Sequence, residues 1–455
     1  MTKKVIVIGA GPGGYPAALK AASLGAQVTL IEKNKAGGVC LNCGCIPSKS
    51  LLDAAHRFYD LHILKTLVCA EAQNAADVLY KNFDFEKIQT RRSNVIAKLQ
   101  QGLLGTFKKA KINYIEGEAS FVSNSQIKAA GKIFDFDAAV IAAGTKAFFP
   151  PPFDKYKDKL HDNSTIFNLK KVPSSLVIIG GGVIGCEFAC IFNALGCKVT
   201  IIEMMPSIIP FEDEAPVRIL RTSLEKRGIE IKTGRIAKDI TFENELKNIL
   251  LDDGSVICAQ EVLVAVGRSV ELASLNLKAA DISYGRKGIS VNPKTMQAKD
   301  NIYAVGDVNG ICLLAHAAHA QGETAAKNIM GINALYNNEA VPKAIYTWPE
   351  IASVGLNKKE AEAKAINAKV YKSFFMANGR ALTQEATEGF VQIVADEKTD
   401  KIIGAQIAGT GASEMIHIPQ MAILSGLTTH QLEENIFAHP TMSEAIKDAL
   451  AKAHL

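Results

Sequence analysis

Residues 5–14 read VIVIGAGPGG, and the fold can be worked out from this stretch. The apolar run at 5–8 is typical of a short buried parallel strand, and the glycines after it precede a predicted helix. They form the pattern G-x-G-x-x-G: Gly9, Gly11 and Gly14. A second predicted strand, 27–31, ends at Glu32. Because such glycines admit a pyrophosphate to the helix N-terminus and such a carboxylate accepts from ribose hydroxyls, the segment predicts a dinucleotide-binding unit.

The same pattern recurs about 170 residues later. An apolar run at 176–179 leads into a second G-x-G-x-x-G, and a predicted strand at 198–202 ends at Glu203. The glycines of this unit are Gly180, Gly182 and Gly185. Two such units indicate two nucleotides bound at once, which favours an electron relay. A carboxylate at Glu203 accepts from a ribose 2′-hydroxyl but repels a 2′-phosphate, so NAD is expected here rather than NADP.

A cluster of cysteines follows the first unit. Residues 37–49 read GGVCLNCGCIPSK and contain Cys40, Cys43 and Cys45. Pro47 suits the first turn of a helix, so Cys45 is expected near a helix N-terminus, where the dipole lowers a thiol pKa. Zinc is disfavoured because no second Cys/His pair follows at ligand spacing, and no metal site is expected. A redox-active disulfide is the favoured interpretation.

Length and composition indicate a globular protein of several domains. The chain has 455 residues, of which 48% are hydrophobic and 21% charged, and this length allows roughly three domains. The net charge of +5 is too small to favour nucleic acid. No apolar stretch reaches the ~20 residues of a membrane span, and the run at 5–8 stops too early for a signal peptide. No membrane contact is therefore expected, and the cytoplasm is the default location.

Taken together, these motifs resemble those of the pyridine nucleotide–disulfide oxidoreductases with the glutathione reductase fold. The resemblance rests first on Gly-Gly-x-Cys-x4-Cys-x2-Pro-Ser-Lys at 37–49 and extends over nearly the whole chain. It implies an α/β fold with two Rossmann-like domains, for FAD and NAD, and a C-terminal α+β dimerisation domain. The expected boundaries are 1–145 for the first FAD segment, 146–272 for the NAD domain, 273–342 for the second FAD segment (the central domain) and 343–455 for the dimerisation domain.

The resemblance also assigns expected roles to individual residues. Cys40 is expected to be the thiol that exchanges with substrate, and Cys45 the thiolate stacked on the flavin. Lys49 is expected near flavin N5, paired with Glu187. Further FAD contacts are expected at the residues Ala119, Gly144, Asp307 and Ala315. The remaining NAD contacts are expected at Ile236 and Gly267.

A base is expected near the C-terminus. Residues 439–444 read HPTMSE, close to a family motif. Oxidising a dithiol requires removal of a thiol proton near neutral pH, where imidazole titrates. His439 is therefore expected to be the base and Glu444 the carboxylate that orients it. In family members this histidine reaches the disulfide of the other subunit, so the resemblance implies an obligate homodimer.

Within the family, the sequence is most similar to the members that oxidise dihydrolipoamide with NAD. That similarity implies a flavin subunit of a 2-oxo-acid dehydrogenase complex, with the lipoyl domain of its acyltransferase as partner. Another NAD(P)H-dependent disulfide reductase of the same family is the alternative. Cys43 replaces a family valine, and a Cys40–Cys43 disulfide is conceivable, although a small apolar substitute is the favoured interpretation. Residues 57–92 match the family poorly and are left without a function.

Overall fold

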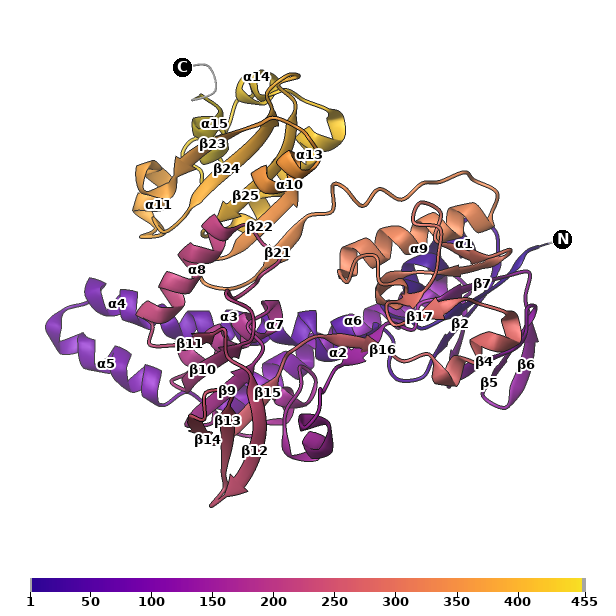
Figure 1. Ribbon diagram of the computed structural model, residues 1–455, viewed down its shortest axis with the longest axis horizontal. Coiled ribbons are helices and arrows are strands. Elements are labelled where there is room, and N and C mark those ends of the chain that lie inside the picture. The colour runs from indigo at the N-terminus through magenta and orange to yellow at the C-terminus, as the bar shows by residue number, and fades with distance from the viewer. Residues whose placement is uncertain (1, 452–455) are drawn as a thin grey trace.

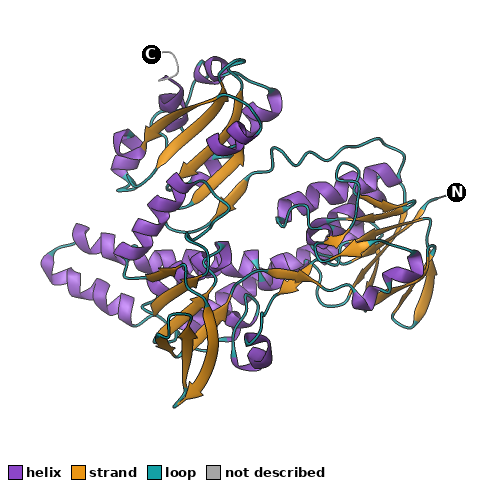
Figure 2. Ribbon diagram, viewed as in Figure 1, coloured by secondary structure: helices purple, strands orange, loops and turns teal. Residues whose placement is uncertain are grey.

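The structure is a computed structural model that describes residues 2–451. Its three domains meet around one helix, α3 (Cys45–Tyr59), as Figure 1 and Figure 2 show. The N-terminal domain and the middle domain are built on parallel sheets, and the C-terminal domain is built on an antiparallel one. The predicted fold class, two Rossmann-like domains followed by an α+β domain, is therefore confirmed.

The N-terminal domain contains a six-stranded sheet in the order β19-β20-β7-β1-β2-β3. The strands are β1 (Lys4–Ile8), β2 (Gln27–Glu32), β3 (Asn113–Glu116), β7 (Ala138–Ile141), β19 (Gln297–Lys299) and β20 (Ile302–Ala304). All neighbouring strands are parallel except β19 and β20. The sheet thus combines four strands from residues 4–141 with two strands from residues 297–304.

The apolar run of β1 is buried on both faces of this sheet. Val5 and Val7 pack in one core with α1 (Gly14–Ser23) and α9 (Ala315–Ile329). Ile6 and Ile8 pack in another core with the small antiparallel sheet β4 (Ala119–Ser123), β5 (Gln126–Ala129) and β6 (Lys132–Asp135). Because successive strand side chains point to opposite faces, a continuous apolar run serves both cores.

The middle domain repeats this plan with a parallel sheet in the order β11-β10-β9-β15. Its strands are β9 (Ser175–Ile179), β10 (Lys198–Glu203), β11 (Glu230–Thr233) and β15 (Glu261–Val264). Its helices are α7 (Val183–Ala194) and α8 (Glu214–Lys226), and an antiparallel meander packs against the sheet: β12 (Ala237–Glu243), β13 (Leu246–Leu251) and β14 (Val256–Ala259). The chain enters through β8 (Thr145–Ala147) and leaves through β16 (Arg268–Val270), which pair antiparallel.

The C-terminal domain has a five-stranded antiparallel sheet in the order β21-β22-β25-β24-β23. The strands are β21 (Lys343–Ile345), β22 (Ile351–Gly355), β23 (Ala368–Phe374), β24 (Phe390–Asp396) and β25 (Ile402–Ala408). The helices are α10 (Lys358–Ala363), α11 (Gly379–Thr383), α12 (Ala412–Met415), α13 (His417–Ser425), α14 (Thr429–Glu433) and α15 (Glu444–Leu450). They pack around a core of their own.

The helix α3 holds the three domains together. One apolar core contains Leu51 of α3, Phe188 of α7 and Phe390 of β24. The helices α2 (Gly38–Cys43), α4 (Leu61–Leu67), α5 (Ala70–Lys81) and α6 (Phe85–Lys109) complete the N-terminal domain. Within residues 2–451, no helix has the length and apolar character needed to span a bilayer.

Candidate functional site

The residues expected to contact FAD lie along one edge of the N-terminal sheet. Gly9 follows the carboxyl end of β1, and Glu32 is the last residue of β2. Gly144 follows β7, and Asp307 follows β20. In an open parallel sheet, ligands bind outside the carboxyl ends of the strands. The remaining members are Gly11 and Gly14 beside α1, Ala119 at the start of β4 and Ala315 at the start of α9.

The residues expected to contact NAD occupy the same edge of the middle sheet. Gly180 follows β9, and Glu203 ends β10. Ile236 follows β11 and is half exposed, and Gly267 follows β15. The other two members, Gly182 and Gly185, lie at the start of α7. The structure therefore places the glycines and the strand-end acidic residue of each predicted set at the carboxyl edge of one sheet, whereas Lys49 lies on α3 and Ala119 on β4.

The glycine loops explain why only glycine fits at the first and third positions. An added Cβ would lie 2.3 Å from the Ala142 carbonyl oxygen at Gly9, and 1.8 Å from the Gly9 carbonyl oxygen at Gly14. Gly180 and Gly185 meet equivalent backbone atoms. At the middle positions there is room for a Cβ: at Gly11 it would lie 3.7 Å from Gly38 Cα, an ordinary contact, and at Gly182 it would meet no described atom beyond its chain neighbours within 4 Å. The middle glycine thus leaves room where a pyrophosphate would approach.

The two acidic residues at the strand ends also hydrogen-bond to the backbone of their own glycine loops. Glu32 accepts hydrogen bonds from the backbone N–H of Ala10 (2.7 Å) and of Asn34 (2.9 Å). Glu203 accepts them from the N–H of Gly181 (2.7 Å) and, through its other oxygen, of Met205 (2.7 Å). Each carboxylate oxygen still has a lone pair for a ribose hydroxyl. Sequence patterns gave no sign of this second, structural role.

A hydrogen-bonded chain connects the Asp307 carboxylate to the cysteine loop. Asp307 Oδ2 accepts from Thr145 Oγ1 at 2.7 Å and lies 3.7 Å from Arg268 Nε. Arg268 also donates to Thr145 Oγ1 (2.7 Å) and to Asn163 Oδ1 (3.2 Å). Asn163 Nδ2 in turn donates to the Cys43 carbonyl oxygen at 3.3 Å. Sequence reasoning missed the roles of Thr145, Arg268 and Asn163, although Arg268 follows the expected NAD-site glycine.

Cys40 and Cys45 are brought together by the break between α2 and α3. Gly44 has backbone torsions (φ −139°, ψ −110°) that are not helical and separate the two helices, and Cys45 is the first residue of α3. Both residues are thiols, and Cys40 donates a hydrogen bond to Cys45. That hydrogen bond, together with the charge of Lys49, lowers the pKa of Cys45 to about 7. The same hydrogen bond and burial raise the pKa of Cys40. The pair is therefore polarised, because Cys45 loses its proton more readily than Cys40.

The titration of Cys45 can be tested directly. In the reduced protein we expect its alkylation by iodoacetamide to increase about tenfold per pH unit below pH 7 and to level off above, because only the thiolate reacts. Cys40→Ala removes the hydrogen-bond donor and should shift the midpoint upward, whereas Cys40→Ser keeps an O–H donor and should shift it less. Mass spectrometry of the Cys45 peptide measures the rate. A wild-type midpoint at the ordinary thiol pKa would contradict the prediction.

Lys49 and Glu187 form the ion pair that the resemblance implied. Lys49 Nζ lies 2.8 and 2.7 Å from the two carboxylate oxygens of Glu187, one turn along α3 from Cys45. Glu187 has only 7% of its side chain exposed and also accepts from the backbone N–H of Tyr346 at 3.1 Å. Lys49 Nζ lies 4.5 Å from the centre of the Tyr346 ring. The pair joins α3 to α7 and to the C-terminal domain.

Removing the lysine of this pair should destabilise the fold. Lys49→Met leaves Glu187 as a buried carboxylate without its cation, and we expect a loss of about 3 kcal/mol in the free energy of unfolding. Glu187→Gln keeps an acceptor for Lys49 and Tyr346 and should cost less. Urea unfolding followed by circular dichroism measures both. Equal stability of Lys49→Met and the wild type would show that the pair contributes nothing.

His439 and Glu444 form the predicted pair at the far end of the C-terminal domain. The His439 Nδ1 atom lies 2.9 Å from Glu444 Oε1, and Glu444 Oε2 accepts from the Thr441 backbone N–H at 2.7 Å. These two contacts, the Thr441 N–H first, hold the pKa of Glu444 below its usual range. The His439 side chain is 80% exposed. A carboxylate on Nδ1 leaves Nε2 of an exposed imidazole available as a base.

This histidine pair is not beside the cysteine pair of its own chain. α15, which begins with Glu444, lies at the outer end of the C-terminal domain in Figure 1, whereas α2 and α3 lie at the junction of the domains. The structure therefore presents two halves of one predicted site on separate surfaces. Cys43, the last residue of α2, is half-buried, and its predicted role stays a prediction.

The residues present fit both nucleotides. The open middle glycines, the starts of α1 and α7 and the carboxylates at the strand ends suit two dinucleotides. Large apolar side chains are left exposed at Val39 in α2 and at Leu313 just before α9, as expected for a surface that a flavin ring covers. Among the side chains that the structure describes, no group of three or more His, Cys, Asp or Glu residues is arranged to hold a metal ion.

Two family models match the chain. Residues 3–322 match "Pyridine nucleotide-disulphide oxidoreductase", and residues 341–450 match its dimerisation domain. Among curated relatives, the dihydrolipoyl dehydrogenase of Bacillus subtilis is 38% identical, covering 98% of this chain and 97% of its own length. That of Staphylococcus aureus is 36% identical, covering 98% of this chain and 96% of its own length. That of Thermus scotoductus is 37% identical, covering 100% and 98%.

Solved structures give the same fold. The HOCl-induced flavoprotein disulfide reductase RclA from Escherichia coli is 27% identical with a TM-score of 0.87, covering 98% of this chain and 99% of its own. LpdA from Mycobacterium tuberculosis is 24% identical with a TM-score of 0.90, covering 99% and 100%. The match to the dimerisation domain supports the expected homodimer. The chain therefore belongs to the pyridine nucleotide-disulphide oxidoreductases, as an NAD-dependent flavoprotein that uses FAD.

Proposed function

We propose that this enzyme is a dihydrolipoyl dehydrogenase, which oxidises the dithiol of dihydrolipoamide to a disulfide and reduces NAD. The observation that carries the proposal is the polarised thiol pair, Cys40 and Cys45, one helical turn from the Lys49–Glu187 ion pair. Relatives that carry this name cover nearly the whole chain at 36–38% identity. A dithiol is the substrate that such a pair can oxidise by exchange of disulfides.

The cysteines exchange with substrate in a fixed order. In the oxidised enzyme, Cys40 and Cys45 share a disulfide. A substrate thiolate attacks Cys40 Sγ, the bond to Cys45 breaks, and Cys45 leaves as the thiolate that the charge of Lys49 stabilises. The second substrate thiolate then attacks the sulfur that is bound to Cys40, so the substrate leaves as a disulfide and both electrons remain on the cysteine pair. Bound FAD and NAD supply the acceptors for these electrons.

His439 removes the thiol protons. Its Nε2 takes the proton from the first substrate thiol, releases it to solvent and then takes the proton from the second thiol, while Glu444 holds the ring through Nδ1 and stabilises the charged imidazolium. Since His439 and the cysteine pair lie on separate surfaces of one chain, the base acts on the cysteines of the second subunit. The site is then composite, and each homodimer has two of them.

The natural substrate in this proposal is a lipoyl group carried by another protein. The partner would be the lipoyl domain of the acyltransferase in a 2-oxo-acid dehydrogenase complex, as the names and extent of the relatives support. A cytoplasmic location is part of the proposal, because a chain whose free cysteines include a reactive pair is suited to a reducing compartment. The FAD and NAD contacts given above are proposed on the same basis.

One assay separates this function from its alternative. The purified protein, loaded with FAD, is mixed with dihydrolipoamide and either NAD or NADP, and the reduced nicotinamide is followed by absorbance. We expect rapid reduction of NAD and at least tenfold slower reduction of NADP, because Glu203 repels a 2′-phosphate. The likeness to the flavoprotein disulfide reductase of E. coli favours a second candidate, a disulfide reductase. The disulfide reductase would be established if the protein did not oxidise dihydrolipoamide but did oxidise NADH or NADPH while reducing another disulfide.

A further inference from the structure

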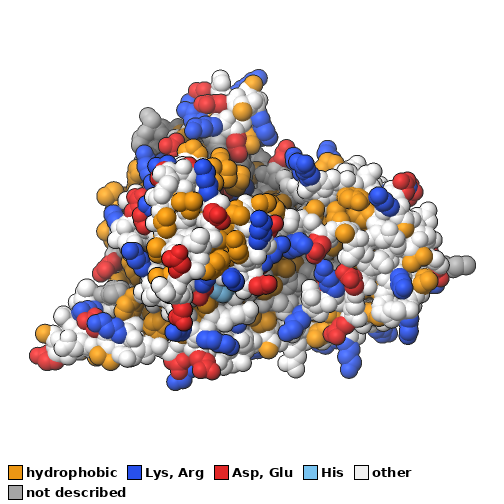
Figure 3. Space-filling model, turned by 60° about the horizontal axis from the view of Figure 1, so that its bottom comes forward, with side chains coloured by type: hydrophobic (Ala, Val, Ile, Leu, Met, Phe, Trp, Pro, Cys, Tyr) orange, Lys and Arg blue, Asp and Glu red, His pale blue; other side chains and the backbone are white. Residues whose placement is uncertain are grey.

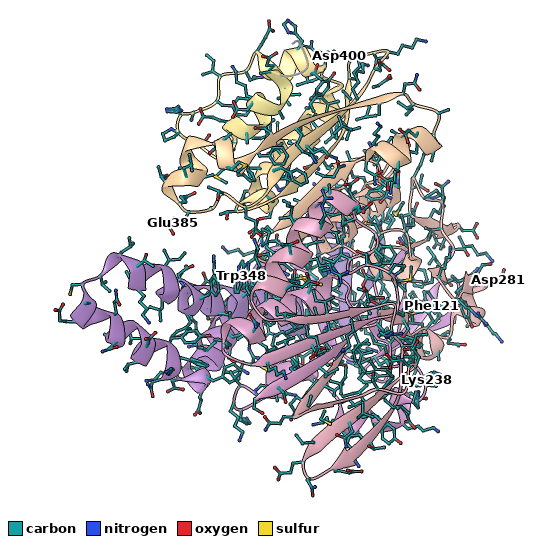
Figure 4. All side chains as sticks on the ribbon, turned by 60° about the vertical axis from the view of Figure 1, so that its left-hand side comes forward. Phe121, Lys238, Asp281, Trp348, Glu385 and Asp400 are labelled. Atoms are coloured by element: carbon teal, nitrogen blue, oxygen red, sulfur yellow. The ribbon has the colours of Figure 1, made fainter. Side chains whose placement is uncertain are left out.

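The helices α4 and α5 form an arm that projects from the rest of the chain. They run antiparallel, and Lys65 of α4 pairs with Asp77 of α5 at 2.6 Å. Figure 1 shows this arm, residues 61–81, leaving the end of α3 and extending away from all three domains. Its root is fixed, since His56 stacks on Trp348 of the C-terminal domain with ring centres 4.7 Å apart. Figure 4 labels Trp348 at this root.

The arm exposes a concentration of large apolar side chains. They are Ile63, Leu64, Leu67, Val78 and Leu79, and Leu67 is 72% exposed. Positions 63, 64 and 67 share one side of α4, and apolar side chains are visible along the arm in Figure 3. An exposed apolar surface of this kind on a projecting element marks a contact with another molecule.

The charges of the arm limit what that molecule can be. Between residues 60 and 82 there are two lysines and three carboxylates. An amphipathic helix that lies on a membrane carries an excess of basic residues on its polar side. The arm lacks that excess and has no basic stripe for nucleic acid. Its surface is suited to an apolar contact with protein.

We infer that the arm packs against the C-terminal domain of the second copy in the homodimer. The arm continues directly from α3, whose first residue is Cys45. In the composite site proposed above, the partner's C-terminal domain brings His439 to the N-terminal end of α3, and α3 leads from there to the arm. That domain also exposes large apolar side chains: Ile436, three residues before His439, is 98% exposed, and Met421 and Leu424 of α13 are exposed as well.

The arm therefore extends the interface that completes the active site. In a two-fold dimer the same contact occurs twice, once for each arm, so the apolar surface contributes to both composite sites. This inference rests on the composite homodimer site of the proposed function, and not on the identity of the dithiol. A measurement of the oligomeric state therefore tests it independently of the substrate.

The decisive variant places charge on the arm: Leu64→Glu combined with Leu67→Glu. The matched control is Leu246→Glu with Leu250→Glu, the same change at two exposed leucines of β13 in the middle domain. FAD absorbance verifies that each protein is folded, and analytical ultracentrifugation over a dilution series gives the dimer dissociation constant. We expect the arm variant to raise that constant at least tenfold and the control to leave it unchanged. Turnover of the arm variant should fall on dilution and recover at high protein concentration.

Other outcomes would overturn the inference. A dimer as tight as the wild type in the arm variant would show that the arm lies outside the interface. The arm variant could also turn over free dihydrolipoamide at the wild-type rate but a lipoylated protein more slowly. That result would mean that the arm binds the lipoylated protein and not the second subunit. If the double variant loses FAD, Leu67→Ser removes the most exposed of the five apolar side chains named on the arm without adding charge. An unchanged dimer dissociation constant in that variant would likewise overturn the inference.

Discussion

Cys45→Ser is expected to lower dihydrolipoamide-dependent reduction of NAD by about three orders of magnitude or more. Serine cannot form a disulfide with Cys40, so no oxidised form of the pair exists to accept a substrate thiolate. The nucleotide-binding loops lie on other elements, so FAD content and the oxidation of NADH by an artificial electron acceptor should be retained. Steady-state kinetics with each acceptor measures the difference.

The matched control for this variant is Cys43→Ser, two residues away. Cys43 lies at the end of α2, and its contact to Asn163 uses the backbone carbonyl, which the substitution keeps. We expect its turnover to stay within about twofold of the wild type. A large loss in Cys43→Ser together with activity in Cys45→Ser would reverse the assignment of the redox pair.

His439→Gln is expected to lower turnover by about 10²–10⁴-fold at neutral pH, the usual contribution of a positioned base. Glutamine keeps a polar side chain but cannot take a proton from the substrate thiol. Glu444→Gln should have a smaller effect, because the ring stays in place but loses the carboxylate that stabilises its charged form. Steady-state kinetics with dihydrolipoamide and NAD at neutral pH measures both effects.

Mixing two inactive variants tests whether the site is composite. When Cys45→Ser and His439→Gln subunits dissociate and reassociate at random, half of the dimers are mixed, and each mixed dimer has one site without either lesion. Activity should recover to about a quarter of the wild-type value in the mixture. Mixing either variant with itself provides the control. No recovery, with mixed dimers demonstrated by mass spectrometry, would mean that the base and the cysteines act within one chain.

Local features of the site could be predicted from the sequence because they depend on residues close in the chain. The structure has α1 at Gly14–Ser23, directly after the glycines that predict a helix there, and β2 at Gln27–Glu32, where the strand was expected. Cys45 was expected near a helix N-terminus, and α3 begins at Cys45 itself. Local sequence chemistry, Gly44 before it and Pro47 after it, determines that start.

Contacts between distant segments could not be predicted in the same way. The contact of Arg268 with Thr145 joins residues 123 positions apart, and that of Asn163 with the Cys43 carbonyl joins residues 120 apart. No periodicity or residue spacing in the sequence predicts contacts between residues so far apart. The polarity of the cysteine pair also depends on Lys49, whose charge is held by Glu187 from another domain. The family resemblance supplied the Lys49–Glu187 pair, whereas composition alone gave no reason to expect it.

The antiparallel pairing of β8 with β16 has a consequence for synthesis on the ribosome. Everything between these strands is contiguous in sequence, so the middle domain can fold as soon as it has emerged. The N-terminal domain must wait, because β20 joins its sheet beside β7 only after more than 150 further residues. Until then the nascent chain has an unpaired parallel edge at β7, which is a template for wrong pairing. Early folding of the middle domain restricts the movement of the β7 edge, because β8 connects β7 directly to that folded domain.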